Sequence, residues 1–316
     1  MSSVAESPVE RLDPRKFRHP ETTADGQRRA KVSLSRIRTL WFNTGSLCNL
    51  TCANCYIESS PRNDRLAYLT AAEVAAFLDE LEAAIEIGFT GGEPFMNPEL
   101  PAMLRDALER GHRALVLTNA MRPMLKRKAD LLALKARHGR RLTLRVSVDH
   151  YGQALHEAER GKHAWQRMLE GLTWLAGEGF DLKVAGRTFG GEGEARLRAG
   201  YARLFAELGL PLDARDPGDL VLFPEMDAGV DVPEITEACW GLLGVSPEAM
   251  MCAHSRMVVR RKGEAEAKVL PCTLLPYDPQ FELGTRLATA AREVSLNHPH
   301  CARFCVLGGG SCSAGD

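Results

Sequence analysis

A partial (β/α)6 barrel of the TIM type, an α/β fold, followed by a small cysteine-rich C-terminal extension, is the architecture that the sequence predicts. Short apolar runs alternate with longer amphipathic segments, which is typical of parallel strands joined by crossover helices. The alternation indicates six strands, fewer than the eight of a closed barrel. The nine cysteines fall into two groups, one directly after the first strand and one near the C-terminus.

The six expected strands are Thr39–Asn43, Ile85–Phe89, Ala114–Thr118, Leu142–Val148, Leu182–Ala185 and Leu220–Phe223. The five expected helices between them are Ala71–Ala83, Pro98–Arg110, Pro123–His138, Ala164–Gly177 and Gly193–Leu208. The first helix has one apolar stripe, made of Val74, Phe77, Leu78 and Leu81. Thr70 is a suitable N-cap because Glu73 follows it at the spacing of a capping box. In barrels of this kind the chemistry lies at the carboxyl ends of the strands.

Three regions are expected: a polar arm over residues 1–38, a partial barrel over residues 39–230 and a cysteine-rich region over residues 231–316. The arm has nine Lys/Arg against five Asp/Glu, and prolines at positions 8, 14 and 20. We expect a mobile or loosely docked arm, and a solvated tail is favoured for it over a substrate-contacting segment.

Composition is that of a soluble globular protein, with 45% hydrophobic and 26% charged residues. The formal net charge of −1 leaves no overall attraction for nucleic acid, and the basic run Arg260–Lys262 is assigned to a solvated turn. There is no apolar signal region and no run of about 18 apolar residues, so no membrane association is expected. The many cysteines do not follow the pattern of a short secreted disulfide scaffold, which favours a cytoplasmic, reducing location.

The first cysteine group has a spacing that indicates metal chemistry. Cys48, Cys52 and Cys55 follow the first strand as C-x3-C-x2-C, and no fourth cysteine follows until Cys239. Three thiolates can hold three irons of a cubane cluster and leave the fourth iron open to another ligand. An open position distinguishes a catalytic metal from a structural one. A zinc site and three unrelated buried cysteines are the alternatives.

The ends of the next three strands also have residues that can contact a ligand. The loop Thr90–Pro94 reads TGGEP; its two glycines let the backbone approach a ligand, and Glu93 supplies an anionic acceptor. A tight turn is the alternative there. The third and fourth strands end in Thr118-Asn119-Ala120 and Ser147-Val148-Asp149, where the alternative is a strand-end cap or Asx turn.

These motifs resemble those of the radical S-adenosylmethionine (SAM) enzymes. The three cysteines match the family's cluster signature, TGGEP matches its GGEP motif, TNA is similar to T-N-G, and SVD is similar to S-[IL]-D. The motifs occur in the family's order. One departure is Asn54, because the residue before the third cysteine is usually aromatic or apolar.

The resemblance implies a [4Fe–4S] cluster whose open iron chelates the amino and carboxylate groups of SAM. An electron from the cluster would cleave SAM to methionine and a 5'-deoxyadenosyl radical, which abstracts hydrogen from a substrate. The implied SAM-binding residues are Gly91, Gly92, Glu93, Thr118, Ser147 and Arg160. Among them Glu93 is assigned to the amino group and Arg160 to the carboxylate, which a guanidinium can bind bidentately, with Arg187 as a second candidate.

Six cysteines lie beyond the expected barrel: Cys239, Cys252, Cys272, Cys301, Cys305 and Cys312. The segment from Cys252 to Cys272 is predicted to be a hairpin with a turn at Gly263, which brings its two cysteines together at the base. The region resembles the SPASM/twitch extensions of radical SAM enzymes, which carry auxiliary [4Fe–4S] clusters. One auxiliary cluster is expected, drawn mainly from Cys252, Cys272, Cys301, Cys305 and Cys312, with Cys239 spare or buried. A zinc site that includes His298 or His300 is the alternative.

The expected function is that of a SAM-dependent radical oxidoreductase or maturase-type enzyme acting on a small molecule or a peptide. A flavodoxin- or ferredoxin-type electron donor is the expected partner. No separate peptide-recognition domain is evident, which tilts the expectation slightly toward a small substrate. A non-catalytic Fe–S electron-transfer protein is one alternative, although it would not need an open iron. A radical methyltransferase is another, which would need catalytic cysteines outside the clusters or a cobalamin domain.

Overall fold

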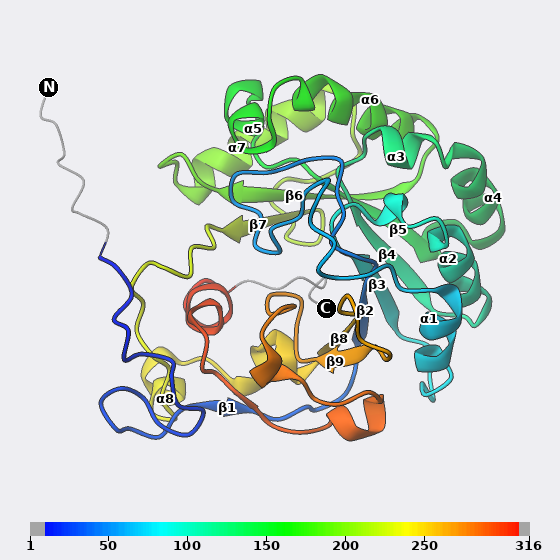
Figure 1. Cartoon of the computed structure of the whole chain (residues 1–316). Helices are drawn as coiled ribbons and strands as arrows, with labels where there is room; N and C mark the ends of the chain where they lie inside the picture. The colour runs from blue at the N-terminus through cyan, green and yellow to red at the C-terminus, as the bar shows by residue number, and fades with distance from the viewer. Residues whose placement is uncertain (1–9, 310–316) are drawn as a thin grey trace, which may run out of the picture.

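The structure of the chain, a computed structural model, describes residues 10–309 (Figure 1). At its centre is an eight-stranded sheet with the strand order β7-β6-β5-β4-β3-β2-β8-β9. Its strands are β2 (Thr39–Asn43), β3 (Glu86–Thr90), β4 (Arg113–Thr118), β5 (Leu142–Ser147), β6 (Asp181–Thr188), β7 (Leu220–Pro224), β8 (Ser255–Val259) and β9 (Lys268–Leu270). Strands β2 to β7 are neighbours in chain order and pair in parallel. The predicted partial barrel is therefore confirmed, with its strands close to the expected bounds.

The helices are α1 (Ala71–Leu78), α2 (Leu100–Glu109), α3 (Arg122–Leu125), α4 (Lys128–His138), α5 (Gln153–Arg160), α6 (Ala164–Gly177), α7 (Glu194–Glu207) and α8 (Cys239–Leu243). Helices α1 to α7 follow one another around the outer side of the sheet, across from the C-terminal region (Figure 1). The capping box of α1 is confirmed: the Thr70 side chain accepts from the N–H of Glu73, and the Glu73 carboxylate accepts from the N–H of Thr70.

Three helical segments differ from the expectation. Helix α1 ends at Leu78 rather than at Ala83. The single helix expected over Pro123–His138 is divided into α3 and α4, because Arg127, between two lysines, leaves the helical conformation. Helix α5 is not evident from its mostly polar sequence, although it buries two polar side chains, His156 and Glu159.

Two hydrophobic cores lie on the two faces of the sheet. Leu40 and Phe42 of β2 pack in the first core with side chains of the surrounding helices, whereas Trp41 packs in the second core with residues of the N- and C-terminal segments. This is the alternation expected of a strand. Gly88 in β3 makes room for the indole, because a Cβ there would lie 2.3 Å from Cε3 of Trp41. The second core therefore fixes the C-terminal region against the barrel.

The C-terminal region also extends the barrel sheet. Strand β8 pairs in parallel with β2, and β9 pairs antiparallel with β8. The hairpin predicted between Cys252 and Cys272 is thus confirmed. Its attachment to β2 is not predicted, because the two strands come from distant parts of the chain. As a result, the hairpin lies beside the strand that leads to Cys48.

The described part of the N-terminal arm, residues 10–38, is docked, so the expectation of a solvated tail is wrong for it. Strand β1 (Lys31–Val32) pairs antiparallel with β10 (Val294–Ser295). Arg29 is buried, and its Nη2 lies 2.5 Å from the carboxylate of Glu234. These two partners are 205 residues apart in the sequence. The polar side chains of the arm therefore serve two purposes: some bind residues distant in the sequence, and others contact solvent.

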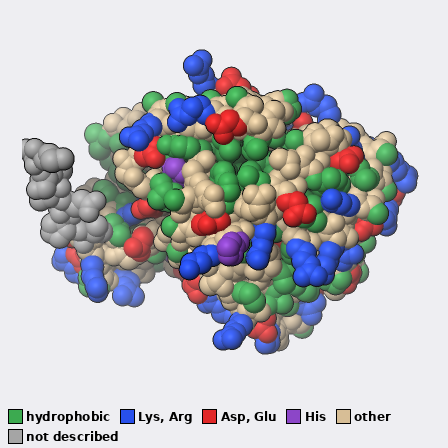
Figure 2. Space-filling model, turned by 90° about the horizontal axis from the view of Figure 1, so that it is seen from above, with side chains coloured by type: hydrophobic (Ala, Val, Ile, Leu, Met, Phe, Trp, Pro, Cys, Tyr) green, Lys and Arg blue, Asp and Glu red, His purple; other side chains and the backbone are tan. Residues whose placement is uncertain are grey.

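Charged side chains show no single dominant sign on the surface. On the face in Figure 2, basic and acidic side chains are interspersed, in keeping with 40 Lys/Arg and 41 Asp/Glu in the whole chain. Within residues 10–309, every helix is too short or too polar to cross a membrane.

Candidate functional site

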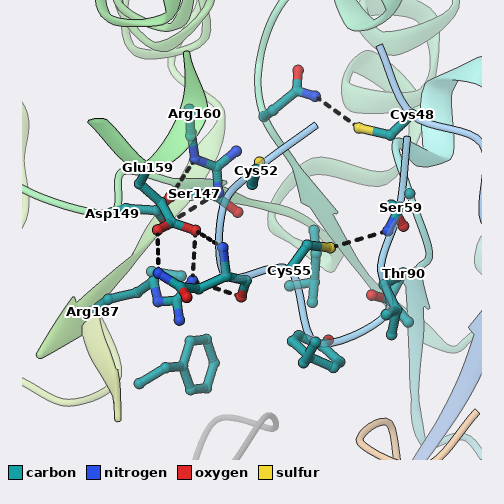
Figure 3. Close-up of a pocket in the computed structure, with 18 of the residues that line it drawn as sticks. Cys48, Cys52, Cys55, Ser59, Thr90, Ser147, Asp149, Glu159, Arg160 and Arg187 are labelled. Carbon is teal, nitrogen blue, oxygen red and sulfur yellow. Dashed lines mark hydrogen bonds and ion pairs between the residues drawn. The ribbon is translucent and has the colours of Figure 1, made fainter. Parts of the chain in front are cut away.

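The predicted ligand residues meet in one cavity at the carboxyl ends of the parallel strands (Figure 3). The cavity has a volume of about 160 Å³. The predicted residues that line it are Cys48, Cys52, Cys55, Gly91, Gly92, Thr118, Ser147, Arg160 and Arg187. Glu93 is the exception, because it lies behind the cavity wall rather than in it. The fold therefore gathers these side chains from five strand ends and from α5.

The three cysteines lie on the loop between β2 and α1, where backbone and side-chain amides face their sulfurs. The sulfur of Cys48 accepts hydrogen bonds from the N–H of Leu50, at 3.4 Å, and from the side-chain amide of Asn119, at 3.9 Å. The sulfur of Cys55 accepts one from the N–H of Ser59, at 3.3 Å. Burial raises the pKa of the Cys48 thiol to about 12. Metal binding would displace this proton, and the N–H donors favour the resulting thiolate.

The glycine pair after β3 is required by its packing against the cysteine loop. Gly91 has a φ of +139°, which L side chains rarely adopt, and a Cβ on Gly92 would lie 2.1 Å from the carbonyl oxygen of Leu47. The N–H groups of Gly92 and Glu93 donate to the carbonyls of Gly45 and Leu47, at 2.8 and 3.1 Å. The TGGE loop therefore holds the chain that leads into Cys48.

Glu93 is buried and organises the polar wall of the cavity. Its carboxylate accepts hydrogen bonds from the Thr118 hydroxyl at 2.9 Å, the N–H of Asn119 at 2.8 Å and the N–H of Phe95 at 3.2 Å. Burial raises its pKa to about 7, against the lowering effect of these donors. Binding of a ligand amino group by Glu93 stays a prediction. In this structure Glu93 fixes the end of β4, where Thr118 and Asn119 lie.

We expect Glu93 to make the stability of the metal-free chain depend on pH. Its pKa is about 7 in the folded chain and near the ordinary 4.5 in an unfolded chain. The folded state holds this proton more tightly, so the free energy of unfolding should fall as the pH rises from about 5 to about 7, by up to about 3 kcal/mol. Urea titrations across this range measure the effect.

Glu93→Gln, which cannot ionise, is the control for this titration. Histidines also titrate in the same range, and the difference between the two proteins isolates the contribution of Glu93. An identical pH dependence in both proteins would show that Glu93 does not carry the effect.

Two buried ion pairs form one side of the cavity (Figure 3). In the first, Arg160 at the end of α5 donates from Nε and Nη2 to the carboxylate of Asp149, at 2.6 and 3.1 Å. Asp149 follows β5, so the pair fixes the guanidinium that is expected to bind a ligand carboxylate. No hydrogen bond from Arg160 Nη1 is found among the described residues, and the side chain lines the cavity.

The second ion pair holds the cysteine loop. The Glu159 carboxylate accepts from the backbone N–H and the side-chain amide of Asn54, at 2.9 and 2.8 Å, and from Nη1 of Arg187, at 3.0 Å. Arg187 also donates to the carbonyl of Asn54, at 3.0 Å. Asn54, the residue that departs from the family pattern, is thus bound through its N–H, carbonyl and side chain. The segment between Cys52 and Cys55 is therefore fixed against α5 and β6.

Several residues of the cavity are not evident from the sequence. Glu159 lies on α5, the helix that the pattern does not reveal. An apolar wall is formed by Tyr56, Ile57, Leu117, Phe223, Pro224 and Met226. The one available signal is Asn54 itself, because a polar residue at a usually apolar position indicates a polar partner.

The side chains of the cavity fit a thiolate-bound cluster with a polar ligand beside it. Three thiols face the same space as the glycine pair, and the Ser59 hydroxyl in the wall is buried with no hydrogen-bond partner among the described residues. A polar ligand would satisfy this hydroxyl. Within residues 10–309, no three His, Cys, Asp or Glu side chains lie close enough together to hold a single metal ion.

A second group of cysteines meets in the C-terminal region. Cys252, Cys272, Cys301 and Cys305 line one apolar cavity of about 20 Å³. Cys252 precedes β8 and Cys272 follows β9, so the hairpin brings them together at its base as predicted. Cys301 and Cys305 lie on a π-helix, Cys301–Val306. Burial raises the pKa of the Cys301 thiol to about 12, so here too a thiolate requires a bound metal.

The other residues predicted for this region are placed as follows. Cys312 lies outside the described residues. Cys239, at the start of α8, lines neither cysteine cavity, and its sulfur lies 3.4 Å from the N–H and the hydroxyl of Thr236. His300 lines the second cavity and His298 does not. Cysteines in the described part of the chain form no disulfide.

Direct packing joins the two cavities. Phe223, in the apolar wall of the first, stacks on Phe304, which lies between Cys301 and Cys305, with ring centroids 5.6 Å apart. Tyr277 donates its hydroxyl to the carbonyl of Ile57, at 2.8 Å. The second cysteine group is therefore part of the support of the first cavity.

Residues 42–196, from the end of β2 into α7, match the model of the radical SAM superfamily and include all the strand-end motifs. The chain therefore contains a radical SAM domain. The cofactors of that superfamily are a [4Fe–4S] cluster and SAM, and the three thiols of the first cavity are residues that fit such a cluster.

Two curated proteins are similar to part of the chain. The antilisterial bacteriocin subtilosin biosynthesis protein AlbA of Bacillus subtilis (strain 168) is 29% identical over 145 residues, which are 45% of this chain and 31% of AlbA. The Fe-coproporphyrin III synthase of Methanosarcina barkeri (strain Fusaro / DSM 804) is 35% identical over 83 residues, which are 25% of this chain and 20% of the synthase. The chain thus spans less than a third of the length of either relative.

Among solved structures, Streptococcus suis SuiB bound to its precursor peptide SuiA is similar to this chain with a TM-score of 0.60. The sequence identity is 12%, and the match covers 82% of this chain and 66% of SuiB. At this identity the likeness shows the shared fold.

Proposed function

We propose that this chain is a radical SAM enzyme that cleaves SAM reductively in the first cavity and abstracts hydrogen from a peptide. A second, auxiliary [4Fe–4S] cluster of the SPASM/twitch kind is assigned to Cys252, Cys272, Cys301 and Cys305. The observation that supports the proposal best is the meeting of three thiols, strand-end hydroxyls and a fixed guanidinium in one cavity. When bound, the cluster supplies the electron that breaks a sulfonium bond of SAM and so starts hydrogen abstraction.

The chain's own residues bind and orient SAM in this proposal. Arg160, held in place by Asp149, presents its remaining N–H groups to the SAM carboxylate. The N–H donors to Cys48 and Cys55 stabilise thiolate charge, which is one way a protein tunes the potential of a cluster. The apolar wall around Phe223 excludes water from the cavity, so that a reactive intermediate is protected from side reactions with water.

A peptide is favoured as substrate because of the names of two similar proteins. AlbA takes part in the biosynthesis of a bacteriocin, and SuiB is bound to a precursor peptide. The proposal of a peptide substrate differs from the expectation from the sequence alone, which slightly favours a small molecule. A porphyrin-like small substrate is the second candidate, because the Fe-coproporphyrin III synthase is also similar to part of the chain.

The two other functions compatible with the sequence receive less support. A radical methyltransferase would need a further cysteine near the first cavity, and Cys239 does not line it. An electron-transfer protein would not need the SAM cradle formed by Gly91, Gly92 and the strand-end hydroxyls.

Anaerobic reconstitution, followed by addition of dithionite and SAM, tests the proposal. About 8 irons per chain and formation of 5'-deoxyadenosine are expected. About 4 irons together with zinc would keep the radical chemistry and make the second site structural. Full iron without 5'-deoxyadenosine would contradict the proposal and favour electron transfer. Deuterium in 5'-deoxyadenosine after incubation with labelled peptides, but not with labelled porphyrins, would identify the substrate class.

A further inference from the structure

Arg256 on β8 is a fully buried cation whose hydrogen bonds all go to neutral groups. Its Nη1 donates to the carbonyls of Cys252 and Ser255, at 2.6 and 2.7 Å. Its Nε donates to the carbonyl of Ala290 at 2.8 Å, and its Nη2 to that of Arg292 at 3.4 Å. No carboxylate pairs with it among residues 10–309. An arginine cannot lose its proton in a protein, so its positive charge is buried without an acidic partner.

Arg29 provides a comparison within the same half of the molecule. It is also fully buried, but its guanidinium is paired with the carboxylate of Glu234 at 2.5 Å. Burying an unpaired charge costs much more than burying a paired one. The chain compensates Arg29 with an acid, and a different source of negative charge is needed for Arg256.

The thiols of the second cavity can supply this charge. Arg256 donates to the backbone carbonyl of Cys252, whose side chain lines that cavity. Protonated thiols are neutral, and as metal ligands they are thiolates. Four thiolates around the doubly positive core of an oxidised four-iron cluster carry a net charge of about −2.

We propose that Arg256 is the internal counter-ion of the metal group bound by Cys252, Cys272, Cys301 and Cys305. The inference rests on the auxiliary cluster of the proposed function. A buried cation stabilises the anionic, metal-bound site and destabilises the metal-free one, so it couples metal binding to folding. Arg256 lies opposite Leu40 of β2 in the sheet, so this coupling extends to the strand that leads to Cys48.

Reconstitution of the full-length chain with iron and sulfide tests the proposal. A Cys48/Cys52/Cys55→Ala background confines the cluster absorption to the second site. Arg256→Gln is expected to weaken cluster binding by about 10–100-fold, the range found when partners of metal ligands are removed, measured as loss of cluster absorption on titration with an iron chelator. Arg256→Lys keeps the charge and should weaken binding much less.

Arg256→Lys is the matched control, because it keeps the buried charge. Urea unfolding with and without the reconstituted cluster then separates a counter-ion from a residue that only holds loops together. The stabilisation gained on cluster binding should be smaller in Arg256→Gln than in the parent.

The outcomes distinguish this inference from the proposed function. Equal losses of stability with and without the cluster, at unchanged resistance to the chelator, would overturn the counter-ion role alone. Absence of iron from the second site of the parent would overturn both the inference and the auxiliary cluster. Should Arg256→Gln not fold, a loss of cluster binding in Arg256→Lys as large as 100-fold would overturn the counter-ion role.

Discussion

Alanine at Cys48, Cys52 or Cys55 is expected to abolish SAM cleavage and to lower the iron content from about 8 to about 4 per chain. The three sulfurs come from one loop, and no other cysteine in the described part of the chain lines their cavity. A lost ligand therefore has no replacement. Iron and acid-labile sulfide assays, together with chromatographic detection of 5'-deoxyadenosine, measure the two effects.

Cys239→Ala is the matched control for these variants. It also removes one cysteine, but from a position that lines neither cavity, so full iron content and full SAM cleavage are expected. Persistent 5'-deoxyadenosine formation in Cys55→Ala would refute the assignment of that residue as a cluster ligand.

Cys272→Ala is expected to lower iron to about 4 per chain while the first cluster is retained. Cys252, Cys272, Cys301 and Cys305 line one cavity, so removal of one thiol breaks a four-ligand set. The electron paramagnetic resonance spectrum of the reduced protein should still change when SAM is added, because the first site is intact. The unfolding temperature should fall, since bound metal contributes to folding.

Cys312→Ala tests whether Cys252, Cys272, Cys301 and Cys305 are the complete set of ligands at the second site. Four thiols of the described residues already complete the set, so this variant is expected to keep its iron. Loss of about 4 irons in Cys312→Ala would make that residue a ligand. Unchanged iron in Cys272→Ala would remove Cys272 from the site.

The barrel could be predicted because its strands and helices are determined by residue patterns within short stretches of the sequence. Each of the strands β2 to β7 is a short apolar run that pairs with the next strand in the chain, and each amphipathic helix covers the same sheet. The pairing of β8 with β2 and the docking of Arg29 against Glu234 could not be predicted, because their partners are distant in the sequence. Helix α5 was hidden for a different reason: it buries polar side chains whose partners lie on other elements.

The site could be predicted as far as strand ends determine it. Parallel strands bring their carboxyl ends to one edge of a sheet, so Cys48, Gly91, Thr118 and Ser147 had to lie near one another. The positions of the two carboxylates of the site, Glu93 and Glu159, depend on side-chain contacts that cannot be predicted from the spacing of residues in the sequence. The Glu93 side chain lies behind the cavity wall because the hydrogen-bond donors at the end of β4 bind it there. Glu159 contacts Asn54 only when α5 is folded.

The pairing of β1 with β10 has a consequence for synthesis of the protein on the ribosome. Lys31 and Val32 are made early, but the strand that they pair with is made among the last residues of the described chain. At about 5–20 residues per second, roughly 15–50 s pass between the two.

During this interval Lys31 and Val32 remain without their strand partner, and Val32 is uncovered. The barrel can form in the meantime, because β2 to β7 pair with their chain neighbours. Loss of residues 294–309 would therefore remove the strand partner of β1 and weaken the docking of the N-terminal arm. A nonsense mutation near the C-terminus should first be detected as proteolysis near the N-terminus.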